Sequence, residues 1–422
     1  MKRYDAYKDS GVEWIGEVPK DWEVMKTSLA FQGIGSGTTP STSKNEFYSD
    51  EGVCWLQTGD LNDGVIIGTS KRVTDLAVRV CNLKLYPIDS VVKAMYGATI
   101  GKVGILGVET ATNQACCVLP ASKNMIAKYS FYEFLACKSS LLVSAIGGGQ
   151  PNISQDTIRK QKIVVPPCNE QTAIAHYLDK KCSEIDKVIS VQRKRISLLQ
   201  ELKQTIITHA VTKGLNPKAE MKNVEYDWIE QLPATWEIAK LKHFIHLING
   251  RAYAQSELLP EGKYKILRVG NFFTNDTWYY SNLELDNEKY CNKGDLLYAW
   301  SASFGPYIWN QDKTIYHYHI WKVCYRECMD KKYVYYMMKA ITNFKLGDIH
   351  GSTMVHITME SMNNSIIPIP SLVEQKDIAS YLDRKCSSID SSISKAQHQI
   401  ELLQEYKQSL ITEVVTGKRK VC

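Results

Sequence analysis

Residues 170–186 read EQTAIAHYLDKKCSEID, and residues 374–390 read EQKDIASYLDRKCSSID. The two stretches align at an offset of 204 residues, and the alignment continues without gaps to residues 213 and 417. About 25 of its 44 positions are identical. Identity at this level over this length marks an internal repeat, so the chain contains one long segment twice.

Both copies carry the periodicity of a long amphipathic helix. Apolar residues recur at alternating intervals of four and three residues, which is the heptad pattern of a coiled coil. The seam of the first copy includes Leu178, Ile185, Ile189, Ile196, Leu199 and Ile206. The seam of the second copy includes Leu382, Ile389, Ile393, Ile400, Leu403 and Leu410. Because two such stripes in one chain most simply bury each other, we predict two long helices packed as a coiled coil.

Sequence signals for helix ends bracket both copies. Asn169 is a plausible N-cap of the first helix, and Ser371 with Glu374 has the spacing of a capping box before the second. Gly214 and Gly417 are suited to end the two helices, because glycine readily adopts the left-handed conformation found just beyond a helix C-terminus. Each copy is therefore predicted to be a helix with its own start and stop.

Weaker similarity extends upstream of both helices. The segment WIGEVPKDWE at residues 14–23 recurs as WIEQLPATWE at residues 228–237, and we expect its tryptophans to pack against the helices. The regions that follow are rich in short β-branched and aromatic runs broken by Gly, Asn and Asp, which is typical of strands and turns in a mixed α/β domain. Two related but diverged domains indicate two different ligands.

The repeat predicts an α+β protein with internal pseudo-two-fold symmetry. Its predicted parts are a leading segment at 1–23, a first globular domain at 24–166, a helix at 167–215, a second leading segment at 216–237, a second globular domain at 238–369 and a final helix at 370–422.

The overall composition is that of a soluble globular protein. A chain of 422 residues is too long for one ordinary core, and 44% hydrophobic with 23% charged residues is typical of globular proteins. No apolar run approaches the roughly 18–20 residues of a membrane span, and the first residues do not form a signal peptide, so we expect a cytoplasmic protein. The 12 cysteines are scattered without a C-x-x-C pair, so we expect reduced thiols. The net charge of +6 permits nucleic-acid binding without requiring it.

Motifs for catalysis, nucleotides or metals are not convincing. The sequence lacks the [DNS]-P-P-[YF] tetrad of an amino-methyltransferase. GATIGKV at 97–103 is one residue shorter than a phosphate-binding loop and ends in Val103 where Ser or Thr would hold magnesium, so a glycine pair in a strand turn is favoured. His317 and His319 form H-x-H without a third ligand, and we expect strand histidines there instead of a metal site.

In its motifs and their order, the chain resembles the specificity (S) subunit of type I restriction–modification systems over essentially its whole length. The resemblance rests on SGVEWIGEVPKDWEV, GSGTTPSTSKNEFY, CWLQTGDLNDG, GATIGKVGIL, ATNQACCVL and GGGQPNIS in the first half, and on GDLLYAWSASFGPYIW, HGSTMVHIT and PIPSLVEQ in the second. The segment NVEYDWIEQLPATWEI departs from the pattern because it lacks the SG and G of the first copy.

The resemblance implies a non-catalytic DNA reader. Two target recognition domains would each contact one half of a bipartite, asymmetric site in double-stranded DNA. The two helices would form an antiparallel coiled coil whose length sets the gap between the half-sites.

The resemblance also implies partners and the cofactors that they hold. Two methyltransferase subunits, which methylate adenine at N6, would dock on the repeated helices and leading segments, and two restriction subunits would join through them. The chain itself would bind no cofactor, because S-adenosylmethionine, ATP and magnesium belong to those partner subunits. No membrane partner is implied.

Candidate DNA contacts are polar and basic residues, several of them in Gly-rich loops, since side chains of these types reach base edges and phosphates. In the first domain they are Thr38, Thr39, Ser41, Lys44, Lys71, Arg72, Arg79, Gln150 and Asn152. In the second domain they are Arg251, Lys265, Arg268, Asn271, His317, His319, His350, Ser352 and Thr353.

Two other functions stay open at this point. One is a non-catalytic scaffold whose two domains bind proteins or other ligands without reading DNA. The other is a fused enzyme, which the missing catalytic motifs disfavour.

Overall fold

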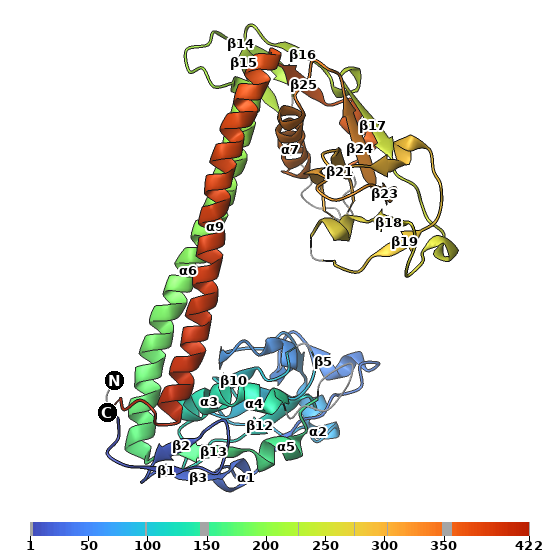
Figure 1. Cartoon of the computed structure of the whole chain (residues 1–422). Coiled ribbons are helices and arrows are strands. Elements are labelled where there is room, and N and C mark those ends of the chain that lie inside the picture. Colours follow the sequence, from blue (N-terminus) through green and yellow to red (C-terminus); the bar gives the residue numbers. More distant parts are fainter. Residues whose placement is uncertain are drawn as a thin grey trace. The chain divides into compact units, whose positions relative to one another are not determined.

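The computed structural model describes residues 3–97, 99–143, 152–226, 228–273, 275–301, 303–347 and 357–421. The chain divides into two compact units, which are Met1–Gln192 with His398–Cys422 and Arg193–Gln397. Each unit contains one globular head, the first part of the long helix that follows it, and the last part of the other long helix (Figure 1).

The first head is built from two sheets and short helices. The five-stranded sheet has the order β4 (Gly35–Ser36), β12 (Cys116–Leu119), β9 (Val91–Ala94), β10 (Val103–Leu106) and β7 (Gly64–Ile66). The four-stranded sheet has the order β11 (Thr110–Thr112), β6 (Val53–Leu56), β8 (Arg72–Val73) and β5 (Tyr48–Ser49). Strand pairs outside these sheets are β1 (Tyr7–Asp9) with β2 (Glu17–Pro19) and β3 (Glu23–Lys26) with β13 (Lys162–Val165). The helices are α1 (Thr27–Ala30), α2 (Asp75–Val80), α3 (Ala127–Ala136), α4 (Lys138–Val143) and α5 (Gln155–Lys160).

The second head repeats this plan. One sheet has the order β17 (Ile245–Asn249), β24 (Ile320–Tyr325), β21 (Leu296–Ala299) and β22 (Gly305–Ile308). The other has the order β19 (Tyr279–Ser281), β18 (Tyr264–Leu267), β23 (Thr314–Tyr316) and β20 (Tyr290–Cys291). The outer pairs are β14 (Met221–Tyr226) with β15 (Ile229–Pro233) and β16 (Glu237–Lys240) with β25 (Ile366–Ile369). The helices are α7 (Lys331–Gly347) and α8 (Met359–Asn363).

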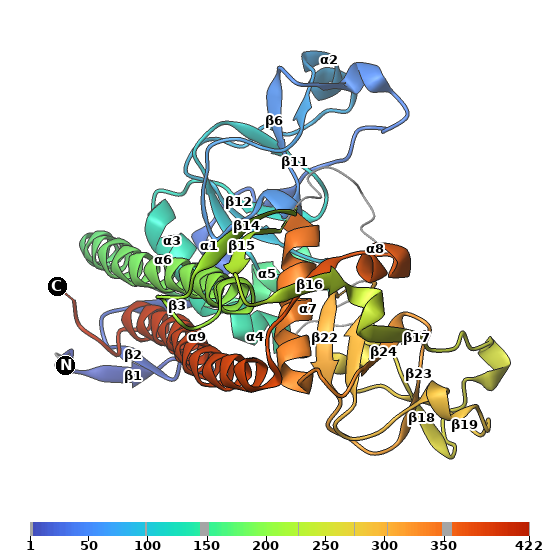
Figure 2. The ribbon, with the colours of Figure 1, turned by 90° about the horizontal axis from the view of Figure 1, so that it is seen from above.

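The repeated segments form two long helices, α6 (Cys168–Lys213) and α9 (Leu372–Val415), which lie side by side (Figures 1 and 2). Asp186 of α6 accepts a bond from Lys407 of α9 at 2.8 Å in the first unit. Lys203 of α6 donates to Asp390 of α9 at 2.6 Å in the second unit. Since residue numbers rise along one helix where they fall along the other, the helices are antiparallel. The predicted fold class is confirmed.

The seam residues lie at the contact between the helices or against the heads. Those that are buried are Leu178, Ile185, Ile189, Leu382, Ile389 and Leu410. Those that are half-buried are Ile196, Leu199, Ile206, Ile393, Ile400 and Leu403. All of the buried members except Ile389 belong to an apolar cluster that also contains residues of a head.

The ends of the helices follow the sequence signals with one exception. Ser371 and Glu374 form the predicted capping box, and Gly214 and Gly417 adopt φ values of +70° and +73° just beyond the helices. The predicted N-cap at Asn169 is wrong, because α6 already begins at Cys168. The carbonyl of Pro167 accepts the first helical bond, from the amide of Gln171 at 3.0 Å.

A buried glutamine joins each long helix to its own head. Gln171 is fully buried; its Oε1 accepts from the amide of Ile126, and its Nε2 donates to the carbonyls of Asn124 and Pro166, at 2.8–2.9 Å. Gln375 makes the same three bonds with residues 330, 328 and 370. All polar atoms of the amide are used, so burial leaves none of them unsatisfied.

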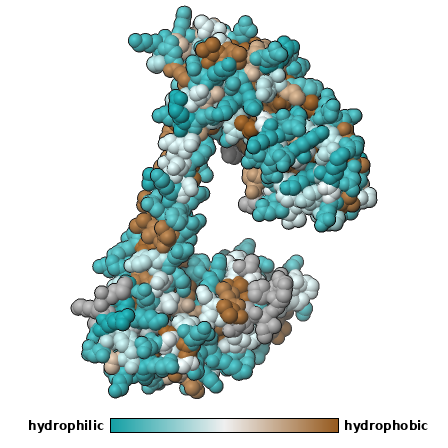
Figure 3. Space-filling model, viewed as in Figure 1, coloured by the Kyte–Doolittle hydropathy of each residue, from teal (hydrophilic) through white to brown (hydrophobic). Residues whose placement is uncertain are grey.

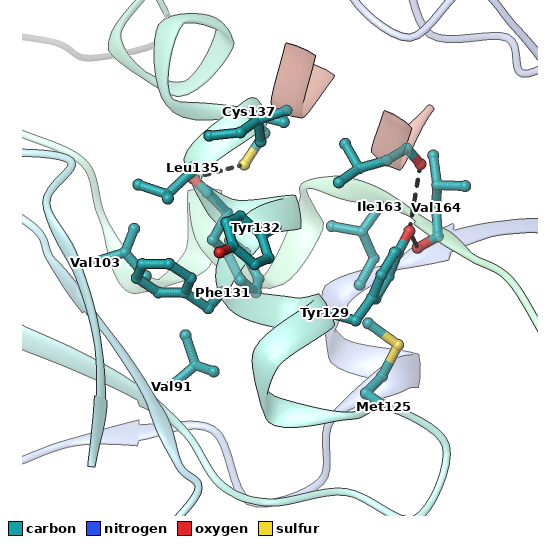
Figure 4. Close-up of a cluster of buried hydrophobic side chains, with 14 of the residues drawn as sticks. Val91, Val103, Met125, Tyr129, Phe131, Tyr132, Leu135, Cys137, Ile163 and Val164 are labelled. Atoms are coloured by element: carbon teal, nitrogen blue, oxygen red, sulfur yellow. Dashed lines mark hydrogen bonds between the residues drawn. The ribbon is translucent and has the colours of Figure 1, made fainter. Parts of the chain in front are cut away.

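A buried tyrosine joins each head to the end of the other helix. Figure 4 shows Tyr129 of the first head beside Val164. The hydroxyl of Tyr129 in α3 lies 3.0 Å from the carbonyl of Val164 and 3.3 Å from that of Val415 at the end of α9. The hydroxyl of Tyr333 in α7 lies 3.1 Å from the carbonyl of Pro368 and 3.3 Å from that of Val211 in α6. Each unit therefore requires both long helices to complete its core.

The leading segments pack on the helix starts through their tryptophans, as expected. Trp22 and Trp236 are almost fully buried. Their indole Nε1 atoms donate to the carboxylates of Glu170 and Glu374, at 3.2 and 3.1 Å. A carboxylate in the first turn also interacts favourably with the helix dipole.

One buried polar contact distinguishes the two units. In the first unit, the amide of Val164 donates to Oε1 of the fully buried Glu133 at 2.8 Å. Burial raises the pKa of Glu133 to about 8. At the offset of 204 residues the second unit has Met337 and Pro368. Proline has no amide hydrogen to satisfy, so the carboxyl group is not needed there.

This difference predicts a coupled pair of substitutions. We expect E133M alone to cost roughly 1–3 kcal/mol, because it leaves the buried amide of Val164 without an acceptor. V164P alone removes the donor from Glu133. The double variant E133M/V164P should be less destabilised than the sum of the two, as measured by urea unfolding. E133Q, which keeps an acceptor, is the matched control, and additive costs would contradict the assignment.

Candidate nucleic-acid interface

Each head carries a short turn at the end of a parallel strand pair. In the first head β6 and β11 are parallel, and the turn 113–115 follows β11. In the second head β18 and β23 are parallel, and the turn 317–319 follows β23. We call these turns the first tip and the second tip. Equivalent backbone bonds, all of 2.9–3.3 Å, hold them: Asn113 N to Leu56 O, Cys116 N to Asn113 O, His317 N to Leu267 O and Ile320 N to His317 O.

A glycine brings a second loop against each tip. A Cβ atom on Gly37 would lie 1.6 Å from the carbonyl oxygen of Thr112, and one on Gly250 would lie 2.3 Å from that of His317. Such distances exclude any side chain at either position, which is a reason for glycine where two backbones meet. The loops 38–44 and 251–254 therefore start in contact with the tips.

Three predicted residues of the first head gather at its tip. The hydroxyl of Thr39 donates to the side-chain oxygen of Gln114, in the tip itself. The carbonyl of Thr38 accepts from the indole of Trp55 at 3.2 Å, which fixes the loop on the four-stranded sheet. Asn152 forms a β-bridge with Tyr96. That bridge lies beside the tip because the amide of Met95 donates to the carbonyl of Ala115 at 2.9 Å.

The other described candidates of this head make their contacts away from the first tip. Ser41 is hydrogen-bonded to Ser43, and the Lys44 ammonium lies 5.1 Å from the ring centre of Phe47. Lys71 and Arg72 line an open cavity with Tyr48, Asp50 and Thr69, among others. Arg72 donates to the carbonyl of Gly52 at 2.9 Å. Arg79 is exposed on α2.

Three predicted residues of the second head also gather at its tip. The carbonyl of Arg251 accepts from the amide of Tyr318 at 3.0 Å, and its guanidinium forms two bonds to Glu257 at 2.7 and 2.9 Å. His317 and His319 lie in the tip, with ring centres 4.9 Å apart. The prediction of strand histidines holds only in part: His317 extends the end of β23 as an isolated β-bridge with Arg251, whereas His319 lies in the turn that follows.

Sequence reasoning missed the aromatic residues around these histidines. Tyr253 stacks beside His317 at 6.4 Å between ring centres, and Trp300 lies 5.0 Å from His319. The indole of Trp300 donates to the carbonyl of Tyr318 at 2.8 Å. Sequence reasoning also missed Gln114. The offset of 204 residues pairs Gln114 with Tyr318, which lies between His317 and His319. This pairing was the sequence signal that could have identified Gln114 and Tyr318 as site residues.

The remaining basic candidates of the second head lie over aromatic rings. The Lys265 ammonium is 5.1 Å from the ring centre of Trp278, and the Arg268 guanidinium is 5.4 Å from that of Tyr279. The side chain of Asn271 accepts from the amide of Arg268 and donates to two carbonyls of its own loop. Asn271 therefore holds the loop in shape. The candidates Gln150, His350, Ser352 and Thr353 lie outside the described residues.

The electrostatic setting of His317 favours its neutral form. Burial, with the nearby His319 and Arg268, lowers the pKa of His317 to about 4. A neutral imidazole offers one donor and one acceptor, which suits a hydrogen-bonding surface more than a site for charge attraction.

The glycine motif that resembles a phosphate-binding loop has a structural explanation. Gly97 and Gly101, with φ values of +84° and +78°, lie in the connection between the antiparallel strands β9 and β10. A phosphate-binding loop leads from a strand into a helix, so GATIGKV has the wrong context. Among the described residues, no three His, Cys, Asp or Glu side chains are grouped to hold a metal ion. Within the same residues, no helix has the length and apolarity to cross a membrane.

Comparisons with known proteins all point to one class, the specificity subunits of type I restriction–modification systems. The family model for the type I restriction modification DNA specificity domain matches residues 19–195 and 233–402. The chain is 26% identical to the type I restriction enzyme MjaVIII specificity subunit of Methanocaldococcus jannaschii over 96% of this chain and 94% of that one. It is 24% identical to the EcoR124I/EcoR124II specificity subunit of Escherichia coli over 55% of this chain and 52% of that one.

Solved structures share the fold. A chain from a study of complex assembly and conformational transition in the type I R-M system superposes with a TM-score of 0.71 at 16% identity, covering 94% of this chain and 98% of that one. The HsdS subunit of Thermoanaerobacter tengcongensis superposes with a TM-score of 0.50 at 16% identity, covering 95% and 98%.

The setting of His317 predicts an acid-sensitive contribution to stability. Its folded pKa of about 4 lies below the ordinary value of 6.5, so the unfolded chain binds the proton first. The contribution of neutral His317 to the free energy of unfolding is present in full above pH 6.5 and is lost as the pH falls through 4. We expect H317N, which copies Asn113 of the first head, to lose less unfolding free energy than the wild type between these pH values. An imidazole titration near 6.5 by NMR would contradict this.

Proposed function

The chain belongs to the family of type I restriction–modification DNA specificity subunits, and we propose that each of its heads reads one half of a bipartite, asymmetric DNA site. As a specificity subunit it is not a catalytic subunit of such a complex. The observation that carries the proposal is the pair of tips. Their backbone frames are equivalent, with required glycines at 37 and 250, while their side chains differ in chemistry.

The chemistry of the two tips suits different bases. The first tip presents the amide of Gln114, and the loop against it presents the hydroxyls of Thr38 and Thr39. Amides pair well with adenine in the major groove. The second presents imidazole, aromatic and guanidinium groups. A fixed frame with exchanged side chains is what reading of two unlike half-sites requires. Phosphate contacts would come from the surrounding Lys71, Arg72, Lys265 and Arg268, which position the DNA without reading it.

The parts of the chain take their roles accordingly. The target recognition domains are 24–166 and 238–369, the leading segments are 1–23 and 216–237, and the helices 167–215 and 370–422 set the spacing between the half-sites. Support for the spacing role comes from the heptad pattern, which is maintained along both helices.

Two identical methyltransferase subunits dock on the helices and leading segments, methylate adenine at N6, and bring two restriction subunits into the complex. Support comes from exposed residues that are equivalent in the two helices. Leu198 and Leu402 are 54% and 49% exposed, and Leu202 and Tyr406, one turn later, are 48% and 50% exposed. Most of the visible surface is hydrophilic, but apolar side chains also gather on part of the helix pair (Figure 3).

An exposed leucine retained in both diverged copies needs a reason outside this chain's own core. Leu198 and Leu402 are each followed at three residues by a glutamate, Glu201 and Glu405, which is exposed in both copies. A partner present twice would find the same apolar and acidic pattern in each unit. The pattern suits a partner surface with an apolar pocket beside a basic side chain.

The reading function is tested by mapping methylation. We expect that co-expression of this chain with its methyltransferase partner in a methylation-free host will modify adenines in one bipartite motif with a fixed gap. Exchange of residues 24–165 for those of a relative should change only one half of the motif. A soluble, associated complex that modifies no DNA would favour the scaffold function instead.

The docking surface is tested by stoichiometry. L198E should remove one of two methyltransferase subunits, L402E the other, and the double variant both, because a buried unpaired charge opposes association. We expect a loss of affinity of about tenfold or more at each altered site, measured by native mass spectrometry and titration. V191K is the matched control, because Val191 is exposed but has Lys395 at the equivalent position. Retention of two partners by L198E/L402E would refute this surface.

A further inference from the structure

Gln114 and Tyr318 occupy the same place in the two heads. Each is the middle residue of its tip, each is exposed, and the offset between them is the 204 residues of the repeat. The residues on either side are fixed by backbone bonds to buried strands, as in Asn113 N to Leu56 O and His317 N to Leu267 O. A side chain at this position therefore projects from a rigid turn, which precise contact with a ligand requires.

The amide of Gln114 is oriented by its neighbour. The hydroxyl of Thr39 donates to Oε1 of Gln114. That bond uses one lone pair of Oε1, so the other lone pair and the Nε2 hydrogens can face a ligand. An oriented amide presents an acceptor and a donor side by side, and this pair complements N6 and N7 of adenine in the major groove.

The ring of Tyr318 is oriented by different means. Its centre lies 4.5 Å from that of His317 and 3.9 Å from that of His319. Its backbone amide donates to Arg251, and its carbonyl accepts from the indole of Trp300. The ring offers an apolar face and one hydroxyl, which complement a thymine methyl group or a single polar base edge, unlike the paired groups of an amide.

We propose that position 114 in the first head and position 318 in the second are specificity-determining, that Gln114 reads an adenine, and that Thr39 is the positioning residue for Gln114. The proposal rests on the DNA-reading function proposed above. It goes beyond that function by naming one base-reading side chain in each half-site and the base class that the first of them selects.

The test uses the full chain co-expressed with its methyltransferase partner, with modified adenines mapped across the genome. Q114A should relax one adenine position in one half-site, so that methylation of sites with another base there rises about tenfold or more relative to the wild type. Y318A should alter one position in the other half-site only. Both residues are exposed, so neither substitution removes core packing.

Thr39 supplies a matched pair of variants. T39V removes the hydroxyl at nearly constant shape and should relax the same adenine position as Q114A, whereas T39S keeps the hydroxyl and should keep the wild-type motif. A purely structural role of Thr39 would lower methylation at all sites equally and would overturn its positioning role.

The outcomes distinguish failure of the base-reading role of Gln114 from failure of the DNA-reading function on which it rests. A wild-type complex without a bipartite motif would refute the DNA-reading function itself. With a wild-type motif in hand, an unchanged motif for Q114A, a relaxed base other than adenine, or a uniform loss of methylation would overturn the reading role of Gln114. Effects of Q114A and Y318A in the same half-site would overturn the equivalence of the two positions.

Discussion

The antiparallel packing of two helices with one repeated sequence is the constraint on which the rest of the structure depends. In such a pair, a contact between two positions recurs with the helices exchanged. One such contact is the ion pair between Lys407 and Asp186 in the first unit. Its equivalent in the second unit is the ion pair between Lys203 and Asp390. These exposed ion pairs add little to stability, but they fix which residues meet. The buried seam supplies the association.

Each head is attached to this helix pair at two buried points. Gln171 and Gln375 join a head to the start of its own helix, while Tyr129 and Tyr333 join it to the end of the other. A head consequently packs only where both helices run side by side in the correct register. This explains why the residues at these four positions keep their type across the repeat while the sheets around them have diverged.

Divergence between the heads is accommodated locally. Where the second unit has Pro368, it also has Met337 in place of a buried glutamate, so that no donor or acceptor is left unpaired. At the tips, the required glycines and the backbone bonds are kept, and the exchanged side chains point away from the core. Exposed positions on a rigid frame are free to change because their substitution costs little folding energy.

The sequence alone determined the repeat, the two long helices, their seam and the α+β class, because heptad periodicity and internal identity are local or directly alignable signals. It also indicated Thr39, Arg251 and His317 as candidate contacts, because of their side-chain chemistry. Only the tertiary structure decided which residues meet: Thr39 with Gln114, and His317 with Tyr253. These partners are separated by tens of residues and come together through strand pairing, which no local pattern encodes. For the same reason, no local pattern distinguishes Gln114 from other polar residues. Its position after β11 places it against Thr39, which orients its amide.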